Sequence, residues 1–270
     1  MLVALYMALF SKKTEIWAVV YAQNIPVESL LSYDLLVFDR EAHPPLALLK
    51  DGHRIVLGYM SMGEAEISRQ NYEVVKALGM TVEPRQDWKG NPLIDVRKPE
   101  WSQYVLNTLI PDILKQGFDG VMIDTVDSII WLEQKDPVRY AGLQRATIGL
   151  IKEIRAKFPK IYIMMNRGFD VLPYVGSDID MLLAESTYTD RNVSTHQPEM
   201  VPMAIHDHYV TQLQAMQQRF RQLKIYTLDY WPPNDVVAVK AIYDQQRSYG
   251  FIPYVSAMEL QEIVTEPKQY

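Results

Sequence analysis

Short apolar runs recur along the chain, and between them lie longer stretches in which apolar positions repeat at about the helical spacing. Each run is nearly continuous in apolar residues, which is typical of strands covered on both faces. Strands that alternate with helices in this way indicate parallel βα units. We predict eight strands, at residues 16–21, 35–38, 55–60, 120–123, 161–165, 181–184, 225–228 and 251–255.

Four of the intervening stretches carry helix start and stop signals. Pro111 predicts a kink in the first of them. The second begins at Asp136, with a proline in the first helical position. The four predicted helices span residues 101–116, 137–158, 207–222 and 235–249.

Eight strands with their helices predict a single-domain (β/α)8 TIM barrel, of the α/β class, over residues 15–270. The alternative, an open doubly wound sheet, commonly has a glycine-rich turn after its first strand, whereas residues 22–26 here read AQNIP. Residues 80–98 break the alternation. We expect them to form an insertion at one rim of the barrel, with Trp88 and Asp95 as candidate ligand groups.

Residues 1–14 stand apart as an N-terminal segment. Met1 to Phe10 is apolar like the centre of a signal peptide, but it lacks basic residues before it and a small-residue cleavage site after it. It is also too short to span a bilayer. We expect an appended remnant or a segment packed on the domain, with a degraded secretion signal as the alternative.

Composition narrows the chemistry. The 33 acidic and 27 basic residues give a net charge of -6, and no basic block exceeds Lys12-Lys13, so we expect no nucleic-acid partner. A neutral or cationic ligand fits this charge better. The absence of cysteine excludes disulfides, thiolate catalysis and cysteine metal sites.

Polar or aromatic residues follow seven consecutive predicted strands. The carboxyl ends of barrel strands meet at one open mouth, where catalytic groups lie. Any one such residue is equally well explained by helix capping, but the whole series indicates a polar site. The series consists of Tyr21, Gln23, Asp39, Glu64, Glu66, Asp124, Asp127, Asn166, Arg167, Glu185, Asp229, Tyr230 and Trp231.

Asp124 and Glu185 each follow directly on a strand expected to be buried. A carboxylate there is strongly destabilised by desolvation unless it faces a polar mouth. Two carboxylates on different strands that face one cavity suit acid/base and nucleophilic attack on a glycosidic bond. The alternative is a pair of structural acids bonded to arginine or backbone groups.

Metal chemistry is the competing use of such acids. Among the histidines, only His206 and His208 are closely spaced, and on a helix their rings point apart, so we interpret them as surface or capping residues. An oxygen-ligand site from Asp124, Asp127 and Glu185 lacks a recognised loop motif. The GxSxG motif of serine hydrolases is missing. We therefore expect no metal and no cofactor.

Aromatic residues are frequent at the predicted strand ends and rim loops. Sugar rings stack on aromatic planes, and a tyrosine hydroxyl adds hydrogen bonds at the same place, although any single aromatic residue can instead fill the core. Trp231 is the best candidate, because Pro232-Pro233 makes its loop rigid directly after a strand. The aromatic candidates are Tyr21, Tyr59, Trp88, Tyr188, Tyr230 and Trp231.

Three strings taken together resemble glycoside hydrolase family 114, over roughly residues 15–258. They are SMGEAE at 61–66, GFDGVMIDTVDS at 117–128 and AES at 184–186. That family includes endo-α-1,4-polygalactosaminidases and is related to the hydrolase domain of the Pel polysaccharide biosynthesis protein. The resemblance implies a (β/α)8 barrel that cleaves α-1,4-linked galactosamine or N-acetylgalactosamine polysaccharide, with Asp124 as nucleophile and Glu185 as general acid/base. It also implies a secreted or periplasmic location.

Around this pair we expect a set of residues that bind the sugar. An acidic cleft would favour the cationic amine of a deacetylated polymer. The alternatives are a non-catalytic carbohydrate-binding barrel, and another glycosidase or a metal-assisted hydrolase on the same fold. We expect a monomer whose partner is a polysaccharide or oligosaccharide. The predicted substrate-binding residues are Tyr21, Tyr59, Glu64, Asp127, Asn166, Asp229, Tyr230 and Trp231.

Overall fold

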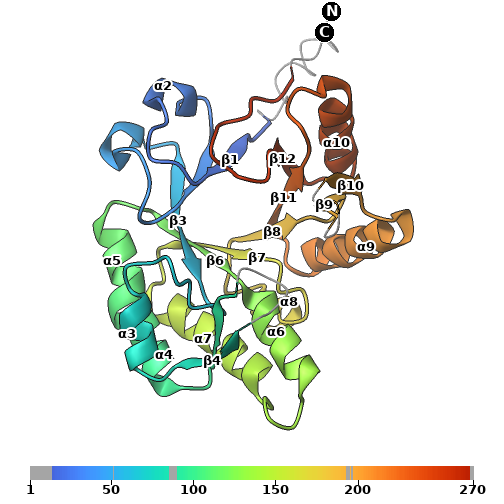
Figure 1. The fold of residues 1–270 in the computed structure, drawn as a ribbon. Coiled ribbons are helices and arrows are strands. Elements are labelled where there is room, and N and C mark those ends of the chain that lie inside the picture. Colours follow the sequence, from blue (N-terminus) through green and yellow to red (C-terminus); the bar gives the residue numbers. More distant parts are fainter. Residues whose placement is uncertain (1–13, 51, 85–89, 193–194, 196, 268–270) are drawn as a thin grey trace, which may run out of the picture.

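A computed structural model describes residues 14–50, 52–84, 90–192, 195 and 197–267. Eight parallel strands form one sheet that curls into a nearly closed barrel (Figure 1). All eight predicted strands are confirmed, with ends within two residues of those expected. In sheet order they are β1 (Trp17–Val20), β2 (Leu35–Phe38), β3 (Ile55–Ser61), β6 (Gly120–Asp124), β7 (Tyr162–Asn166), β8 (Met181–Glu185), β11 (Lys224–Tyr230) and β12 (Ile252–Ser256).

The first and last strands meet at a seam that a tryptophan bridges. The Trp17 indole nitrogen donates to the carbonyl of Ile252 at 2.9 Å. The indole ring is buried against the rings of Tyr226 and Tyr254, with centroid distances of 5.4 and 5.7 Å. Side-chain packing thus joins the two ends of the sheet.

Helices lie around the outside of the barrel (Figure 1). Most of them cover the strands with a buried apolar face. A 3-10 turn, η1 (Leu46–Leu49), and a π-helical turn, η2 (Val105–Leu109), complete the described helical segments. The α-helices are α2 (Val27–Leu30), α3 (Tyr72–Ala77), α4 (Pro99–Tyr104), α5 (Ile110–Lys115), α6 (Val126–Lys135), α7 (Leu143–Lys157), α8 (Leu172–Val175), α9 (Met203–Arg219) and α10 (Val236–Ser248).

Two predicted helices agree closely with the structure. The prediction for 235–249 is confirmed as α10, and the Asp235 carboxylate caps it by accepting from the Ala238 amide at 3.1 Å. The prediction for 101–116 corresponds to the run α4, η2 and α5. Its π-helical turn directly precedes the turn that contains Pro111, so the irregularity expected from that proline is present.

The other two helices begin elsewhere than predicted. The prediction that a helix starts at residue 137 is wrong, because the Asp136 carboxylate accepts from the amides of Val138 and Arg139 and forms a turn instead. Helix α7 begins at Leu143, after Gly142 in the left-handed conformation. Helix α9 begins four residues before the expected position 207.

Two antiparallel hairpins extend the barrel. Residues 80–98 contain β4 (Thr81–Pro84) paired with β5 (Pro92–Ile94), which is the expected insertion. Asp95 is not available as a ligand there, because it is buried and paired with Arg97 at 2.8 Å; Trp88 lies outside the described residues. The second hairpin, β9 (Thr189–Arg191) with β10 (Pro198–Met200), was not predicted.

The expectation for the N-terminal segment falls almost wholly on residues 1–13, outside the described part of the chain. Within that part, no helix has both the length and the apolar character needed to cross a bilayer.

Candidate active site

Three neighbouring strands, β6, β7 and β8, end in the polar residues Asp124, Asn166 and Glu185. The Asn166 amide nitrogen donates to Asp124 Oδ1 at 2.8 Å and to Glu185 Oε2 at 2.5 Å. Placed end to end, those two distances put the two carboxylate oxygens no more than about 5.3 Å apart. The structure therefore brings the two predicted catalytic acids together through one amide group.

The backbone turns in the same way after each of these strands. Thr125, Arg167 and Ser186 follow the three residues directly and have φ angles of 64°, 52° and 54°. Left-handed backbone is uncommon for residues other than glycine and is concentrated at functional sites. These turns lead the chain away from the barrel immediately after the residue whose side chain reaches the mouth.

Burial and mutual repulsion set the protonation of the acidic pair. Burial and, after it, the charge of Glu185 raise the pKa of Asp124 to about 7, even though the hydrogen bond from Asn166 lowers it. We infer that the pair shares about one proton near neutral pH, because two carboxylates this close do not both ionise readily. One of them can then donate a proton while the other carries negative charge.

Tyrosines form the wall around the pair. Tyr230 donates a hydrogen bond to Glu185 Oε1. The rings of Tyr21 and Tyr59 pack edge to face with centroids 5.4 Å apart, and both line the same cavity. Burial raises the pKa of all three phenols well above the usual value, so each remains a neutral hydrogen-bond donor.

Glu64 holds the loop after β3 against the start of α6. It is 4% exposed, and its two carboxylate oxygens accept from the Ser128 hydroxyl at 2.8 Å and the Asn91 amide at 3.2 Å. The neighbouring Gly63 lies so close to β6 that a Cβ atom would be 2.2 Å from the Thr125 carbonyl oxygen. Glu64 therefore borders the cavity while it also fixes the loops on which the site depends.

Arg69, which the sequence patterns did not reveal, organises the part of the cavity wall that contains Asp39, Glu66 and Tyr59. Arg69 contacts Asp39 at 2.6 Å and Glu66 at 3.1 Å, and its guanidinium lies 5.2 Å from the centre of the Tyr59 ring. Arg69 lies in the long loop after β3 and not at a strand end, so no positional pattern pointed to it. It partly neutralises this wall and fixes Tyr59.

Asp127 does not line the cavity. It lies at the start of α6, its side chain is 48% exposed, and it is 3.5 Å from the Arg167 guanidinium. Arg167 in turn donates to the backbone carbonyl of Glu185 at 2.6 Å. Asp127 and Arg167 link the loops that follow β6, β7 and β8, and the sugar contact of Asp127 stays a prediction.

Asp229 is a structural acid, which corrects its predicted role in sugar binding. It is fully buried and accepts from the Thr189 amide at 2.8 Å, the Tyr188 amide at 3.2 Å and the Gln246 side chain at 2.7 Å. Its carboxylate is thus occupied by protein donors and does not border the cavity. It anchors the β9–β10 hairpin instead.

The expectation of surface or capping histidines is wrong for His206. It lies on α9, is 1% exposed, and its ring makes a 2.9 Å hydrogen bond to the carbonyl of Thr187. His206 is therefore a core residue that supports the segment after Glu185. Its neighbour His208 lies two residues further along the same helix.

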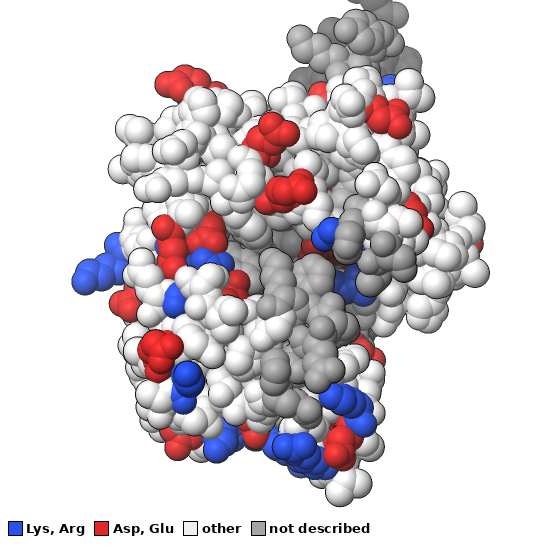
Figure 2. Space-filling view, in the orientation of Figure 1, with Lys and Arg blue, Asp and Glu red and all other residues white. Residues whose placement is uncertain are grey.

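The cavity above the acidic pair has a volume of ≈ 450 Å³, within the range of small-ligand sites. On the face drawn in Figure 2, acidic side chains gather above and to the left of the central hollow, and basic side chains border it on the right. Among the described residues that line the cavity, the acids outnumber the arginines by six to two. They are Asp39, Glu64, Glu66, Asp124, Glu185 and Glu259, against Arg69 and Arg191.

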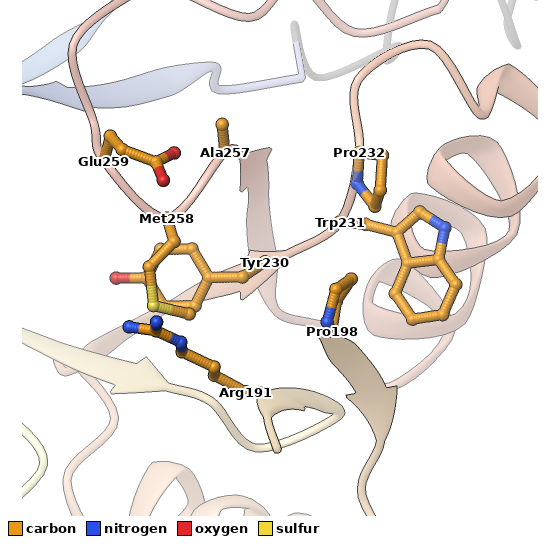
Figure 3. A pocket seen from close by; sticks show the side chains of 8 residues that line it. All are labelled: Arg191, Pro198, Tyr230, Trp231, Pro232, Ala257, Met258 and Glu259. Carbon is orange, nitrogen blue, oxygen red and sulfur yellow. The ribbon is translucent and has the colours of Figure 1, made fainter. Parts of the chain in front are cut away.

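A second pocket of ≈ 190 Å³ adjoins this cavity, with Arg191, Tyr230, Met258 and Glu259 as shared walls. Trp231 lines this adjoining pocket and not the main cavity; its indole nitrogen donates to Asp235 at 3.1 Å. Figure 3 shows Tyr230 and Trp231 pointing in opposite directions. Tyr21 and Tyr59 thus line the main cavity, Tyr230 lines both hollows, and Tyr188 lines neither of them.

A (β/α)8 barrel with two carboxylates joined at its mouth is the arrangement of a barrel glycoside hydrolase. The sequence matches the family described as glycoside-hydrolase family GH114 over residues 6–270, and the chain belongs to that family.

Other proteins of known sequence or structure are similar to this chain. An uncharacterized protein of Deinococcus radiodurans is 24% identical over 216 residues, which is 78% of this chain and 67% of that protein. The glycoside hydrolase domain of PelA from Pseudomonas aeruginosa is 24% identical, with a TM-score of 0.82 over 93% of this chain and 98% of that chain. Aspergillus fumigatus Ega3, solved in complex with galactosamine, is 17% identical, with a TM-score of 0.69 over 92% of each chain. These structures share the fold.

Proposed function

We propose that the protein cleaves α-1,4-linked polymers of galactosamine or N-acetylgalactosamine with retention of configuration. The observation that carries the proposal is the pair Asp124 and Glu185, held by one amide so that two of their oxygens are at most about 5.3 Å apart. Retaining glycosidases have carboxyl groups about 5 to 5.5 Å apart, whereas inverting enzymes need about 6.5 to 9.5 Å to admit a water molecule. The galactosamine bound to Ega3 supports the choice of sugar.

The two carboxyl groups divide the reaction between them. In the first step an Asp124 oxygen bonds to the anomeric carbon, the glycosidic C–O bond breaks, and Glu185 gives its proton to the leaving oxygen. In the second step Glu185 takes a proton from water, the water oxygen bonds to the anomeric carbon, and the bond to Asp124 breaks. Asn166 and Tyr230 hold the two acids in place throughout.

Incubation with α-1,4-linked galactosamine oligomers, acetylated and not, tests the proposal. We expect mass spectrometry to show shorter oligomers, and proton NMR to show the α-anomer as the first product. Glucose oligomers with the same linkage serve as the matched substrate and should remain intact. Failure to shorten either hexosamine oligomer, or a first product of the β-anomer, would contradict the substrate and the mechanism respectively.

The acidic excess in the cavity gives a second expectation. A free amine is cationic at neutral pH, so the excess of acids over arginines in the cavity, which remains when Asp124 and Glu185 share one proton, should attract a deacetylated oligomer. We expect KM for that oligomer to rise several-fold between 0.05 and 0.5 M salt, roughly as screening shortens the reach of charge. KM for the acetylated oligomer should change little. If KM for the two oligomers depended equally on salt, electrostatic attraction of the amine would be contradicted.

The family resemblance also leads us to propose a secreted or periplasmic location, which cell fractionation would test. We further propose a monomeric state, which light scattering would test.

A further inference from the structure

The adjoining pocket combines one cationic donor with an apolar wall. It is lined by Arg191 from strand β9, by Pro198 from β10, by Tyr230, Trp231 and Pro232 at the end of β11, and by residues 257–259 after β12. Figure 3 shows Arg191 and Met258 on the Tyr230 side of this pocket, Pro198 between Tyr230 and Trp231, and Pro232 above Trp231. Its ≈ 190 Å³ volume is well below that of the main cavity, which suits one sugar unit and not a longer segment.

Arg191 is available to a ligand. It is partly buried, and within the described part of the chain its guanidinium makes no ion pair or hydrogen bond with another side chain. Arg69, the other arginine among the described residues that line the two hollows, is engaged, because it contacts Asp39 and Glu66. A partly buried guanidinium with five donor positions favours a ligand that brings an acceptor oxygen.

The apolar wall indicates which acceptor fits. An acetamido group carries a carbonyl oxygen and a methyl group side by side, so it can accept from Arg191 while its methyl contacts Met258 or the two prolines. A free ammonium group would instead lie beside a like charge, which is unfavourable in a partly buried site. An anionic sugar would suit Arg191 itself, but the excess of acidic side chains in the main cavity would repel it.

Glu259 is the one acid that also borders the adjoining pocket. It is exposed, so water and salt screen its charge more than that of Arg191. Figure 3 places Glu259 and Arg191 on opposite sides of Met258. The two charges therefore act on different parts of the pocket.

We propose that the adjoining pocket is a subsite for an N-acetylated hexosamine unit next to the sugar that is attacked, and that Arg191 selects the acetamido group over the free amine there. The inference rests on the proposed function and deepens it. The two hollows would thus prefer opposite states of the amine: cationic in the acid-rich cavity, acetylated beside Arg191.

Sequencing the products from a partly acetylated galactosamine polymer tests this subsite. With the wild-type enzyme, we expect the new ends on one side of the cleaved bond to be acetylated about 10-fold more often than chance, and those on the other side to show no such enrichment. Arg191→Gln should abolish the enrichment, Arg191→Lys should keep most of it, and Arg191→Glu should reverse it towards the free amine. Thermal unfolding of each variant establishes that it is folded.

Two matched variants separate this selection from a general charge effect. Arg145→Gln makes the same charge change on the outer helix α7, and Glu259→Gln removes the other charge of the pocket. Both should leave the enrichment in place. If Arg191→Gln still cuts with wild-type enrichment, or if the wild-type enzyme cuts without enrichment on either side, the subsite is refuted while the proposed function stands. If no hexosamine polymer is cut, both fail.

Discussion

Asp124→Asn and Glu185→Gln should each lower kcat for polymer cleavage by about 10³-fold or more. The first removes the carboxylate that bonds to the anomeric carbon, and the second removes the proton donor for the leaving oxygen; single groups of this kind contribute about 10² to 10⁴ in rate. Reducing-end assays on hexosamine polymer would measure the loss.

A substrate with a good leaving group distinguishes the two roles. A nitrophenolate leaves without a proton, so cleavage of an aryl hexosaminide by Glu185→Gln should recover much of its first-step rate. The same substrate should not rescue Asp124→Asn, because the bond to the anomeric carbon still cannot form. Rescue of Asp124→Asn alone would mean that the two roles are reversed.

Stability provides a control for Asp124→Asn. Burial holds the pKa of Asp124 near 7, above its usual 3.8, so the folded protein keeps a proton that the unfolded chain loses between these pH values. The stability gained from this proton is complete at low pH and is lost as pH rises through 7. At pH 8 the wild type must keep Asp124 ionised in a buried site, which costs stability. Asp124→Asn removes this charge and should be at least as stable as wild type at pH 8. Asp229→Asn, at a buried acid outside the cavity, should lower stability but retain the activity of the folded fraction.

Asn166→Ala should lower kcat by about 10²-fold with a smaller effect on KM. Its amide nitrogen contacts both acids, at 2.8 and 2.5 Å, and a preorganised donor of this kind contributes about 2 to 4 kcal/mol to a transition state. Its bond also lowers the pKa of Asp124. The variant should therefore shift the basic limb of the pH–rate profile to higher pH, which a general loosening of the fold would not do.

The pH profile decides whether Asn166 acts in this way. For wild type we expect a bell whose basic limb lies near pH 7, where the pair loses its last proton. Asn107→Ala, at an exposed helical position, is the matched control and should leave both rate and profile unchanged. A large fall in kcat for Asn166→Ala with an unmoved basic limb would limit Asn166 to a role in packing.

The barrel and its acidic pair follow from patterns that are local in sequence. Each strand is a short run buried on both faces, so the apolar runs located all eight strands. Asp124 and Glu185 are the last residues of their strands, and parallel strand ends meet at one mouth. Both facts could be derived without knowledge of any long-range contact.

Asp229 shows where that reasoning stops. It also follows an apolar run, but β11 continues to Tyr230, so Asp229 is one position before the end of its strand. Side chains alternate between the two faces of a strand, and this single step directs Asp229 to Gln246 on α10 while Tyr230 reaches Glu185. An apolar run does not fix the end of a strand to one residue. The face of β11 to which the Asp229 carboxylate points could therefore not be predicted.

Arg69 and Arg191 could not be predicted for a different reason. They lie in a loop and in a short hairpin, where neither a period of 2 nor a period of 3.6 applies. Their importance comes from contacts with residues distant in sequence, such as the pairing of Arg69 with Asp39, 30 positions away. Such contacts exist only once the barrel has brought its loops together.

The left-handed residues after the three site strands have a consequence for engineering. Each such conformation costs about 1 to 2 kcal/mol for a residue that carries a Cβ atom, so Thr125, Arg167 and Ser186 hold torsional energy next to the chemistry. Glycine at these positions would relieve the strain but free the chain to sample other turns. A search for heat-resistant variants would therefore select glycine substitutions in these turns. We expect such substitutions to raise the melting temperature and to lower the catalytic rate.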